Sequence, residues 1–119
     1  MDKENSVTIG FFGQTEAEKF LQNKGMTVLE TNYRRKTGEI DLIVQHGSYI
    51  VFVEVKYRNS KKYGLPREAV NAAKQKRIHN TALHYIVEKR LDERDFRFDV
   101  VELLHTKDGL IINHIENAF

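Results

Sequence analysis

The stretch GEIDLIVQHGSYIVFVEVKY, residues 38–57, decides the fold because it holds two β-prone runs separated by a turn signal. Residues 39–44 form the first run, and residues 49–57 form the second, which is rich in valine. The intervening His46-Gly47 predicts a tight hairpin turn. A near-continuous apolar run is typical of a strand covered on both faces, so the second run is expected at the centre of a sheet.

The remaining elements are predicted outward from this hairpin. Residues 9–24 have helical spacing of apolar side chains, with Gly25 where helices commonly stop, and residues 26–32 are β-prone before a polar break. Residues 58–65 have the composition of a loop, and Pro66 is placed to begin a long helix to about residue 90. Residues 96–104 and 110–112 predict a last hairpin, closed by the turn Lys107-Asp108-Gly109. The expected architecture is α/β, in the order helix, three strands, helix, two strands.

Composition restricts the class of protein. The chain has 119 residues, with 19 basic and 17 acidic side chains and a net charge of +2, which suits a single domain over 1–119. The absence of cysteine excludes disulfide scaffolds and thiolate metal sites. No apolar run approaches the roughly 20 residues needed to cross a bilayer, so no membrane association is expected. The first residues lack the basic-then-apolar order of a signal peptide, and we therefore expect a cytoplasmic protein.

Positive charge is concentrated in one part of the chain. Residues 56–77 carry eight basic side chains and one acidic side chain, a local charge of +7. Such a segment is typical of a surface that meets a polyanion, although a solvated loop and helix face would have the same composition. The candidate nucleic-acid-binding residues come from this segment and from the polar break before the hairpin: Arg34, Arg35, Arg58, Lys61, Lys62, Lys74 and Arg77.

Three acidic residues interrupt the two most apolar strands, where an unpaired carboxylate is unfavourable. Side chains alternate along a strand, so Glu39 and Asp41 share one face of the first strand, and Glu54 and Lys56 share one face of the second. A two-residue His46-Gly47 turn would bring these faces together, with Glu39 opposite Glu54.

The clustered carboxylates predict a cation site. Two carboxylates about 4 Å apart repel by roughly 4 kcal/mol at an effective dielectric constant near 20. Lys56 supplies one positive charge, and Mg²⁺ or Mn²⁺, held by Asp41 and Glu54, would supply more. A metal ion beside a lysine suits hydrolysis of a phosphodiester bond. The alternative is an ion-pair network on a half-exposed sheet face.

The hairpin motifs also carry a family resemblance. GEID at residues 38–41 and FVEVK at residues 52–56 resemble the D…ExK signature of the PD-(D/E)xK nuclease superfamily. Together with Asn32-Tyr33-Arg34 and RFDV at residues 97–100, they resemble the bacterial YraN family, also called UPF0102, over residues 13 to about 104. The resemblance implies a restriction-endonuclease-like fold, with a mixed sheet, an α-β-β-β-α-β core and flanking helices. It also implies a metal-dependent endonuclease for DNA, distantly similar to Holliday junction resolvases.

One position departs from the family pattern and keeps a second interpretation open. The family has a glutamate in the first helix where this chain has Gln14, which retains an oxygen ligand but lacks the negative charge. The resemblance implies catalytic roles for Asp41, Glu54 and Lys56, supported by Glu39 and Gln14. The alternatives are a nucleic-acid-binding module with the same fold and weak or no turnover, and a structural or protein-interaction domain. The sequence leaves homodimerisation open.

Overall fold

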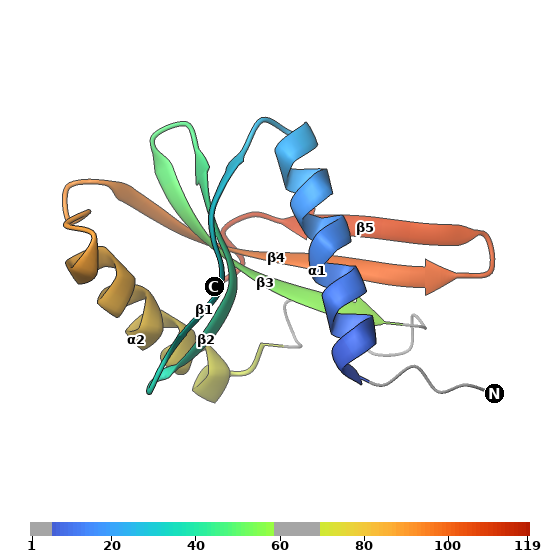
Figure 1. Ribbon diagram of the computed structural model, residues 1–119, viewed down its shortest axis with the longest axis horizontal. Coiled ribbons are helices and arrows are strands. Elements are labelled where there is room, and N and C mark those ends of the chain that lie inside the picture. Colours follow the sequence, from blue (N-terminus) through green and yellow to red (C-terminus); the bar gives the residue numbers. More distant parts are fainter. Residues whose placement is uncertain (1–5, 59–69) are drawn as a thin grey trace.

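The computed structural model describes the backbone of residues 6–58 and 70–119, and the side chains of residues 12–58 and 70–119. The described residues form two helices and five strands, whose order along the chain confirms the prediction (Figure 1). The elements are α1 (Ser6–Asn23), β1 (Thr27–Arg35), β2 (Gly38–His46), β3 (Tyr49–Arg58), α2 (Ala72–Glu88), β4 (Asp95–Thr106) and β5 (Gly109–Ile115).

The strands form one mixed sheet in the order β1-β2-β3-β4-β5. All neighbouring pairs are antiparallel except β3 and β4, which run parallel. A parallel pair needs a long crossover connection, and the segment that contains α2 supplies it here. The central position of β3, predicted from its apolar run, is confirmed, and the protein has a mixed α/β architecture.

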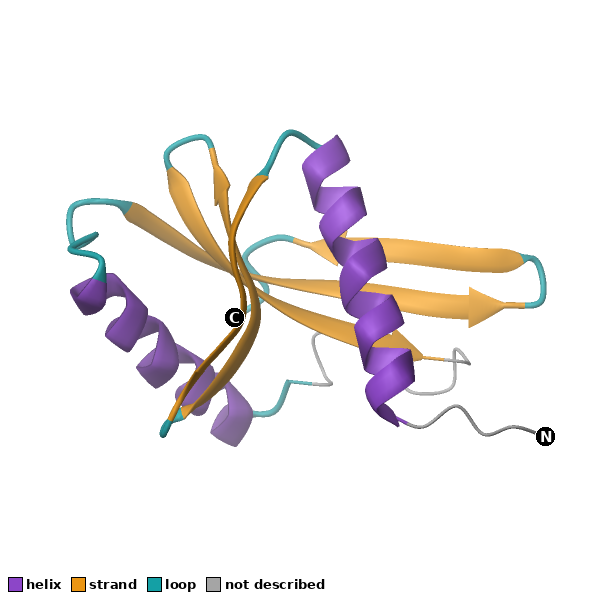
Figure 2. Ribbon diagram, in the orientation of Figure 1, coloured by secondary structure: helices purple, strands orange, loops and turns teal. Residues whose placement is uncertain are grey.

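The two helices cover opposite faces of the sheet, and each buries its own hydrophobic cluster (Figure 2). Ala17 and Leu21 of α1 pack against a cluster on one face that includes Val53 of β3. Ile78 and Tyr85 of α2 pack on the other face against a cluster that includes Phe52 and Val100. Alternate side chains of β3 therefore pack into two separate hydrophobic clusters, as expected for a strand that is covered on both faces.

The hairpin between β2 and β3 differs from the predicted register by two residues. His46 pairs with Tyr49, so the two turn residues are Gly47 and Ser48, and the expected opposition of Glu39 to Glu54 is wrong. Gly47 has a φ of +61°, which favours glycine at the first position of a tight hairpin turn. The shift is an even number of residues, so the predicted sharing of one face by Asp41 and Glu54 survives.

β1 is longer than predicted, because residues 33–35 continue the strand in place of a polar break. Arg34 pairs with Glu39 and Arg35 with Gly38, so only two residues remain in the turn to β2. Tyr33 is buried against α2, where its ring meets Tyr85 edge to face at 5.2 Å between centroids. This packing outweighs the polarity of the neighbouring arginines and keeps the segment in the sheet.

The second helix begins later than predicted. Pro66 lies outside the described residues, but Val70 and Asn71 precede the helix, which starts at Ala72. Asn71 is its N-cap, and the side-chain oxygen accepts a hydrogen bond from the backbone N–H of Lys74 at 2.9 Å. Asparagine is among the strongest N-cap residues, so it sets the start of the helix here. Of the helices in the described parts of the chain, none has the length and apolar character needed to span a membrane.

Candidate active site

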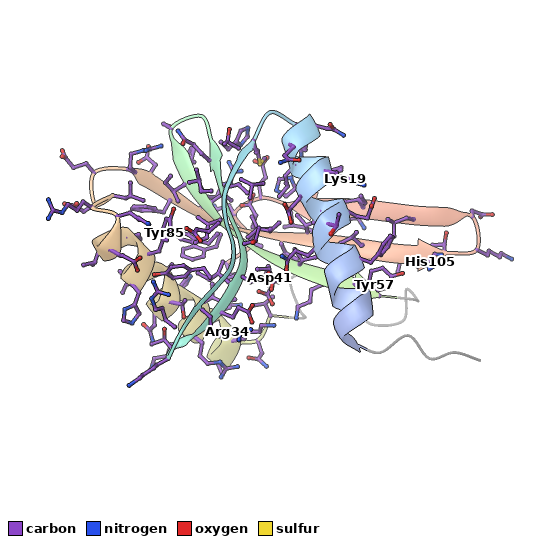
Figure 3. All side chains as sticks on the ribbon, in the orientation of Figure 1. Lys19, Arg34, Asp41, Tyr57, Tyr85 and His105 are labelled. Atoms are coloured by element: carbon purple, nitrogen blue, oxygen red, sulfur yellow. The ribbon has the colours of Figure 1, made fainter. Side chains whose placement is uncertain are left out.

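The polar site lies on the α2 face of the sheet, where the pairing of β2 with β3 ends. The last paired residues are Leu42 and Val53, and the next along the strands are Asp41 and Glu54. The backbone N–H of Val55 donates a hydrogen bond to the side chain of Asp41, at 2.8 Å from Oδ2, and not to a backbone carbonyl of β2. Asp41 and Glu54 line one pocket together with Gly38, Glu39, Lys74, Arg77 and Ile78. Figure 3 shows Asp41 near the middle of the molecule, between the two helices.

The environment of Asp41 opposes its ionisation. Burial and the charge of Glu54 raise the pKa of Asp41 from 3.8 to about 7, and Glu39 adds to the effect. The hydrogen bond from Val55 and the charge of Lys74 act in the opposite direction, but they do not compensate. Asp41 and Glu54 thus line the same pocket, and the charge of Glu54 opposes the ionisation of Asp41 there.

Glu54 is held by two lysines from different elements. Its side chain is 6% exposed, and its Oε2 atom lies 2.5 Å from Lys74 Nζ and 3.5 Å from Lys56 Nζ. Burial and the neighbouring Lys74 lower the pKa of Lys56. Burial also acts to lower the pKa of Lys74, but its ion pair with Glu54 outweighs burial and raises the pKa. The pocket therefore places acidic and basic side chains next to each other.

Glu39 and Gln14 belong to a second polar chain that reaches the pocket from the side of α1. The side-chain amides of Gln14 and Asn32 exchange two hydrogen bonds, at 2.8 and 3.0 Å. Asn32 also donates to Glu39 Oε2 at 3.0 Å, and Arg34 donates to Glu39 Oε1 at 3.2 Å. Gln14 therefore contacts the chain that orients Glu39, and it pairs with an amide rather than with Asp41 or Glu54.

The predicted nucleic-acid-binding residues are dispersed. Arg35 pairs with Glu88 of α2 at 2.6 Å and lies over the ring of Tyr33. Arg58 pairs with the buried Glu102 at 3.1 Å, and its side chain is only 10% exposed.

Of the other predicted nucleic-acid-binding residues, Lys74 contacts Glu54 in the pocket, as described above. Arg34 is highly exposed at the β1–β2 end of the molecule (Figure 3). Arg77 is exposed at the rim of the pocket and forms no ion pair with another described residue. Lys61 and Lys62 lie outside the described residues.

The donor set at the pocket suits a hard divalent cation with few protein ligands. Within residues 12–58 and 70–119, no group of three or more His, Asp or Glu side chains is arranged to hold a metal ion. Two mutually repelling carboxylates are nevertheless sufficient for Mg²⁺, which often binds one or two carboxylates and completes its octahedron with water or phosphate oxygens. Asp41 and Glu54 are the residues that would hold such an ion.

Comparison with other sequences adds a family to this geometry. Residues 13–103 match the family described as "Uncharacterised protein family UPF0102". The chain belongs to this family. A UPF0102 protein of Alkaliphilus metalliredigens is 49% identical over 114 residues, which cover 96% of this chain and 99% of the relative. A UPF0102 protein of Clostridium acetobutylicum is 46% identical over 92% of both chains, and one of Caldanaerobacter subterraneus is 43% identical over the full length of both.

Two features of this UPF0102 site are not visible in the sequence pattern. Asn32 connects Gln14 to Glu39 although the two lie in different elements, and its positive φ of +50° marks it as an unusual strand residue. Lys74, predicted as a phosphate-binding residue, contacts Glu54 directly. The basic composition of residues 56–77 predicted that Lys74 binds an anion. Its contact with Glu54 could not be predicted, because it depends on where α2 packs against the sheet.

Proposed function

We propose that this UPF0102 protein is a metal-dependent nuclease of the PD-(D/E)xK type that hydrolyses phosphodiester bonds in DNA, with branched DNA as a candidate substrate. The observation that carries the proposal is the convergence of Asp41 and Glu54 on one pocket, with Lys56 beside Glu54 on the same strand face. The order helix, three strands, helix, strand supports a restriction-endonuclease-like arrangement of this sheet.

The roles of the protein groups follow from their positions. Asp41 and Glu54 hold Mg²⁺ or Mn²⁺ in this proposal, and the bound ion would polarise the scissile phosphate and lower the pKa of a water. Lys56 lies 3.5 Å from Glu54 Oε2 on the same strand face, so in this proposal its ammonium group orients the attacking water or stabilises the charge that develops on the phosphate. Glu39, fixed by Asn32 and Arg34, adds negative charge at the edge of the pocket.

A cleavage assay tests the proposal. Purified protein is incubated with Mg²⁺ or Mn²⁺ and with linear, flapped and four-way DNA, beside an Asp41→Ala variant and an Asp108→Ala control in the exposed β4–β5 turn. We expect wild type and the control to cleave at least one substrate, and Asp41→Ala to lose at least 10²-fold in rate, because loss of a metal ligand removes charge stabilisation at the phosphate. Cleavage by Asp41→Ala at the wild-type rate would refute the proposal that this protein is a nuclease.

A second candidate is a nucleic-acid-binding module with the same fold and no turnover. The uncharged Gln14 favours it, because its amide is engaged with Asn32 and contributes no negative charge to the pocket. This candidate predicts DNA binding that weakens linearly with the logarithm of salt concentration, survives EDTA and is accompanied by no cleavage. A structural or protein-interaction domain would bind no DNA even at low salt.

A further inference from the structure

Lys74 occupies the place at Glu54 where a divalent cation would be expected. Its ammonium nitrogen is 2.5 Å from Glu54 Oε2, closer than Lys56 at 3.5 Å. The lysine comes from the first turn of α2, where the N-cap Asn71 fixes its backbone N–H. Its side chain is about one-third exposed, at 31%, whereas that of Glu54 is buried at 6%. The lysine therefore has an outward path open to it, whereas the carboxylate does not.

The two carboxylates of the pocket are unequally compensated. Glu54 has both lysines within ion-pair distance, whereas Asp41 has the Val55 N–H as its hydrogen-bond donor among the described residues. Lys74 acts on both carboxylates, because its charge also favours the ionised form of Asp41. The ammonium group of Lys74 thus stabilises both carboxylates, as a bound cation would.

Lys74 in this position and a divalent ion at Glu54 exclude each other. Mg²⁺ binds carboxylate oxygens at about 2.1 Å, so an ion on Glu54 Oε2 would lie no more than about 4.6 Å from an ammonium nitrogen that kept its present distance from that oxygen. Repulsion between a double and a single positive charge at that separation inside a partly buried pocket is strong. The metal ion can bind well only if Lys74 moves away from Glu54.

We propose that Lys74 is an internal counter-ion that competes with the divalent cation for Glu54, and that metal binding releases it toward the phosphates of the substrate. Arg77 lies one turn further along α2 at the rim of the same pocket, so the released ammonium would join a second cation there. The inference rests on the proposed function, since it assigns Asp41 and Glu54 to the metal. Lys74 is a positioning residue in this scheme: it holds Glu54 in place until the ion arrives.

Metal affinity provides the first test, with free Mn²⁺ measured by electron paramagnetic resonance. We expect Lys74→Gln to bind Mn²⁺ roughly tenfold more tightly than wild type, because no counter-ion has to be displaced. Lys74→Arg, which keeps the charge, should bind no more tightly than wild type. Lys76→Gln is the matched control, because it removes one exposed charge two residues along the same helix and should change the affinity less than twofold.

The second readout follows the ammonium group itself by NMR of the lysine side chains. The Nζ–H signal that disappears in Lys74→Gln belongs to Lys74, and adding Mg²⁺ to wild type should shift or broaden it more than the signal of Lys76. Equal Mn²⁺ affinity in wild type, Lys74→Gln and Lys76→Gln, with a Lys74 signal that ignores Mg²⁺, would overturn the inference. An equal rise in Mn²⁺ affinity in Lys74→Gln and Lys76→Gln would also overturn the inference, because the loss of one positive charge anywhere on the helix would then explain the effect.

Separate variants distinguish this failure from failure of the proposed function. Asp41→Asn and Glu54→Gln should each weaken Mn²⁺ binding at least tenfold if these carboxylates hold the ion. If they do so while Lys74→Gln behaves as wild type, only the counter-ion role is lost. If wild type and all variants bind Mn²⁺ equally or not at all, the metal centre itself is wrong, and the counter-ion role fails with it.

Discussion

At the residue scale, Asp41 is a group whose ionisation opposes folding in the metal-free protein. Its pKa is about 7 in the folded state and near 3.8 when exposed. The folded chain therefore binds the extra proton between these values, and stability falls as the pH rises through this window. Strongly shifted pKa values are frequent at functional sites, so this unfavourable carboxylate is consistent with the proposed metal site.

We therefore predict that Asp41→Asn stabilises the protein above pH 7 in the absence of added divalent ions, although the proposed function expects the same variant to bind metal more weakly. Asparagine has no proton to lose, and its side-chain oxygen can still accept the Val55 N–H. The gain in free energy of unfolding should be about 2–4 kcal/mol at pH 8 and should vanish near pH 4. Urea denaturation at the two pH values measures it. A variant less stable than wild type at pH 8 would contradict the prediction.

Asp99 is also a buried acid, but its ionised form is stabilised, in contrast to that of Asp41. It lies outside the candidate site, and its hydrogen bonds stabilise the fold. The sequence predicts a pair with Arg97, because the two residues share a strand face, and the structure confirms it with bonds of 2.9 and 3.0 Å. His114 lies 2.7 Å away, and the N–H of Asn117 donates at 3.0 Å. Burial acts to raise the pKa of Asp99, but these hydrogen bonds outweigh it and the pKa is lowered.

Asp99→Asn is expected to reduce the free energy of unfolding by about 3–5 kcal/mol at pH 7, because it removes the buried partner of Arg97 and leaves this arginine with the longer 3.8 Å pairing to Glu116. A lowered folded pKa means that the stabilisation is complete above the unfolded pKa near 3.8 and is lost as the pH falls through the folded value. The difference between variant and wild type should therefore shrink in acid. Asp108→Asn, in the exposed β4–β5 turn, is the control and should change stability by less than about 0.5 kcal/mol.

At the element scale, a glycine allows the β1–β2 hairpin to approach α2 closely. Gly38 has a φ of +150°, and a Cβ there would lie 3.3 Å from Thr81 Oγ1 of the helix. The hydroxyl of Thr81 is itself 2.7 Å from that of Thr37 in the turn. The hairpin carries Glu39 and Asp41, so this close approach sets how the helix meets the site.

Gly38→Ala should cost about 1–3 kcal/mol, since it combines an unfavourable backbone conformation with a tight contact. Gly47→Ala is a matched comparison, because Gly47 also has a positive φ but nothing lies near its Cβ position. We expect the Gly38 variant to lose more stability, measured by thermal unfolding. A larger loss for Gly47→Ala would show that contact with α2 does not matter.

The predictions succeeded where local chemistry decides and failed where packing decides. Alternation along the strands was sufficient to bring Asp41 and Glu54 to one face, and valine content was sufficient to centre β3. The register was wrong by two residues because it depends on which residue opens the turn, and Gly47 took that position. The contact of Lys74 with Glu54 depends on the placement of α2, for which a single sequence holds no local signal.

At the scale of the whole molecule, the sheet has an interior and two unlike edges. β3 lies at its centre, with Val51 and Val53 fully or almost fully buried. The edge strand β1 carries a bulge between Val28 and Glu30 and charged side chains beyond it. The other edge, β5, runs in regular register with β4 and contains no Asp, Glu, Lys or Arg. Charges and bulges protect an edge from pairing with another chain, so β5 is the less protected edge.

Native-state hydrogen exchange should separate these regions. Amides of β3 are expected to exchange only through global unfolding, whereas the outward amides of β5 should exchange at least 10²-fold faster through local opening. The measurement is mass spectrometry or NMR at low protein concentration. If the amides of β3 and β5 were equally protected from exchange, β5 would not be a free edge. Protection of β5 that rises with protein concentration would then show that two copies of the chain pair through this strand.

The parallel pairing of β3 with β4 also has a consequence for how the protein matures on the ribosome. Every pair in this ladder, from Tyr49 with Asp95 to Arg58 with Leu104, joins residues 46 positions apart. When Asp41 and Glu54 have left the ribosome but β4 has not, the nascent chain lacks the strand that pairs with β3 beside Glu54. Pairing between residues so far apart in the sequence forms late in folding. The same pairing that shapes the pocket delays its assembly until β4 has been synthesised, so a nascent chain that stops before Asp95 would lack the strand that pairs with β3 beside Glu54.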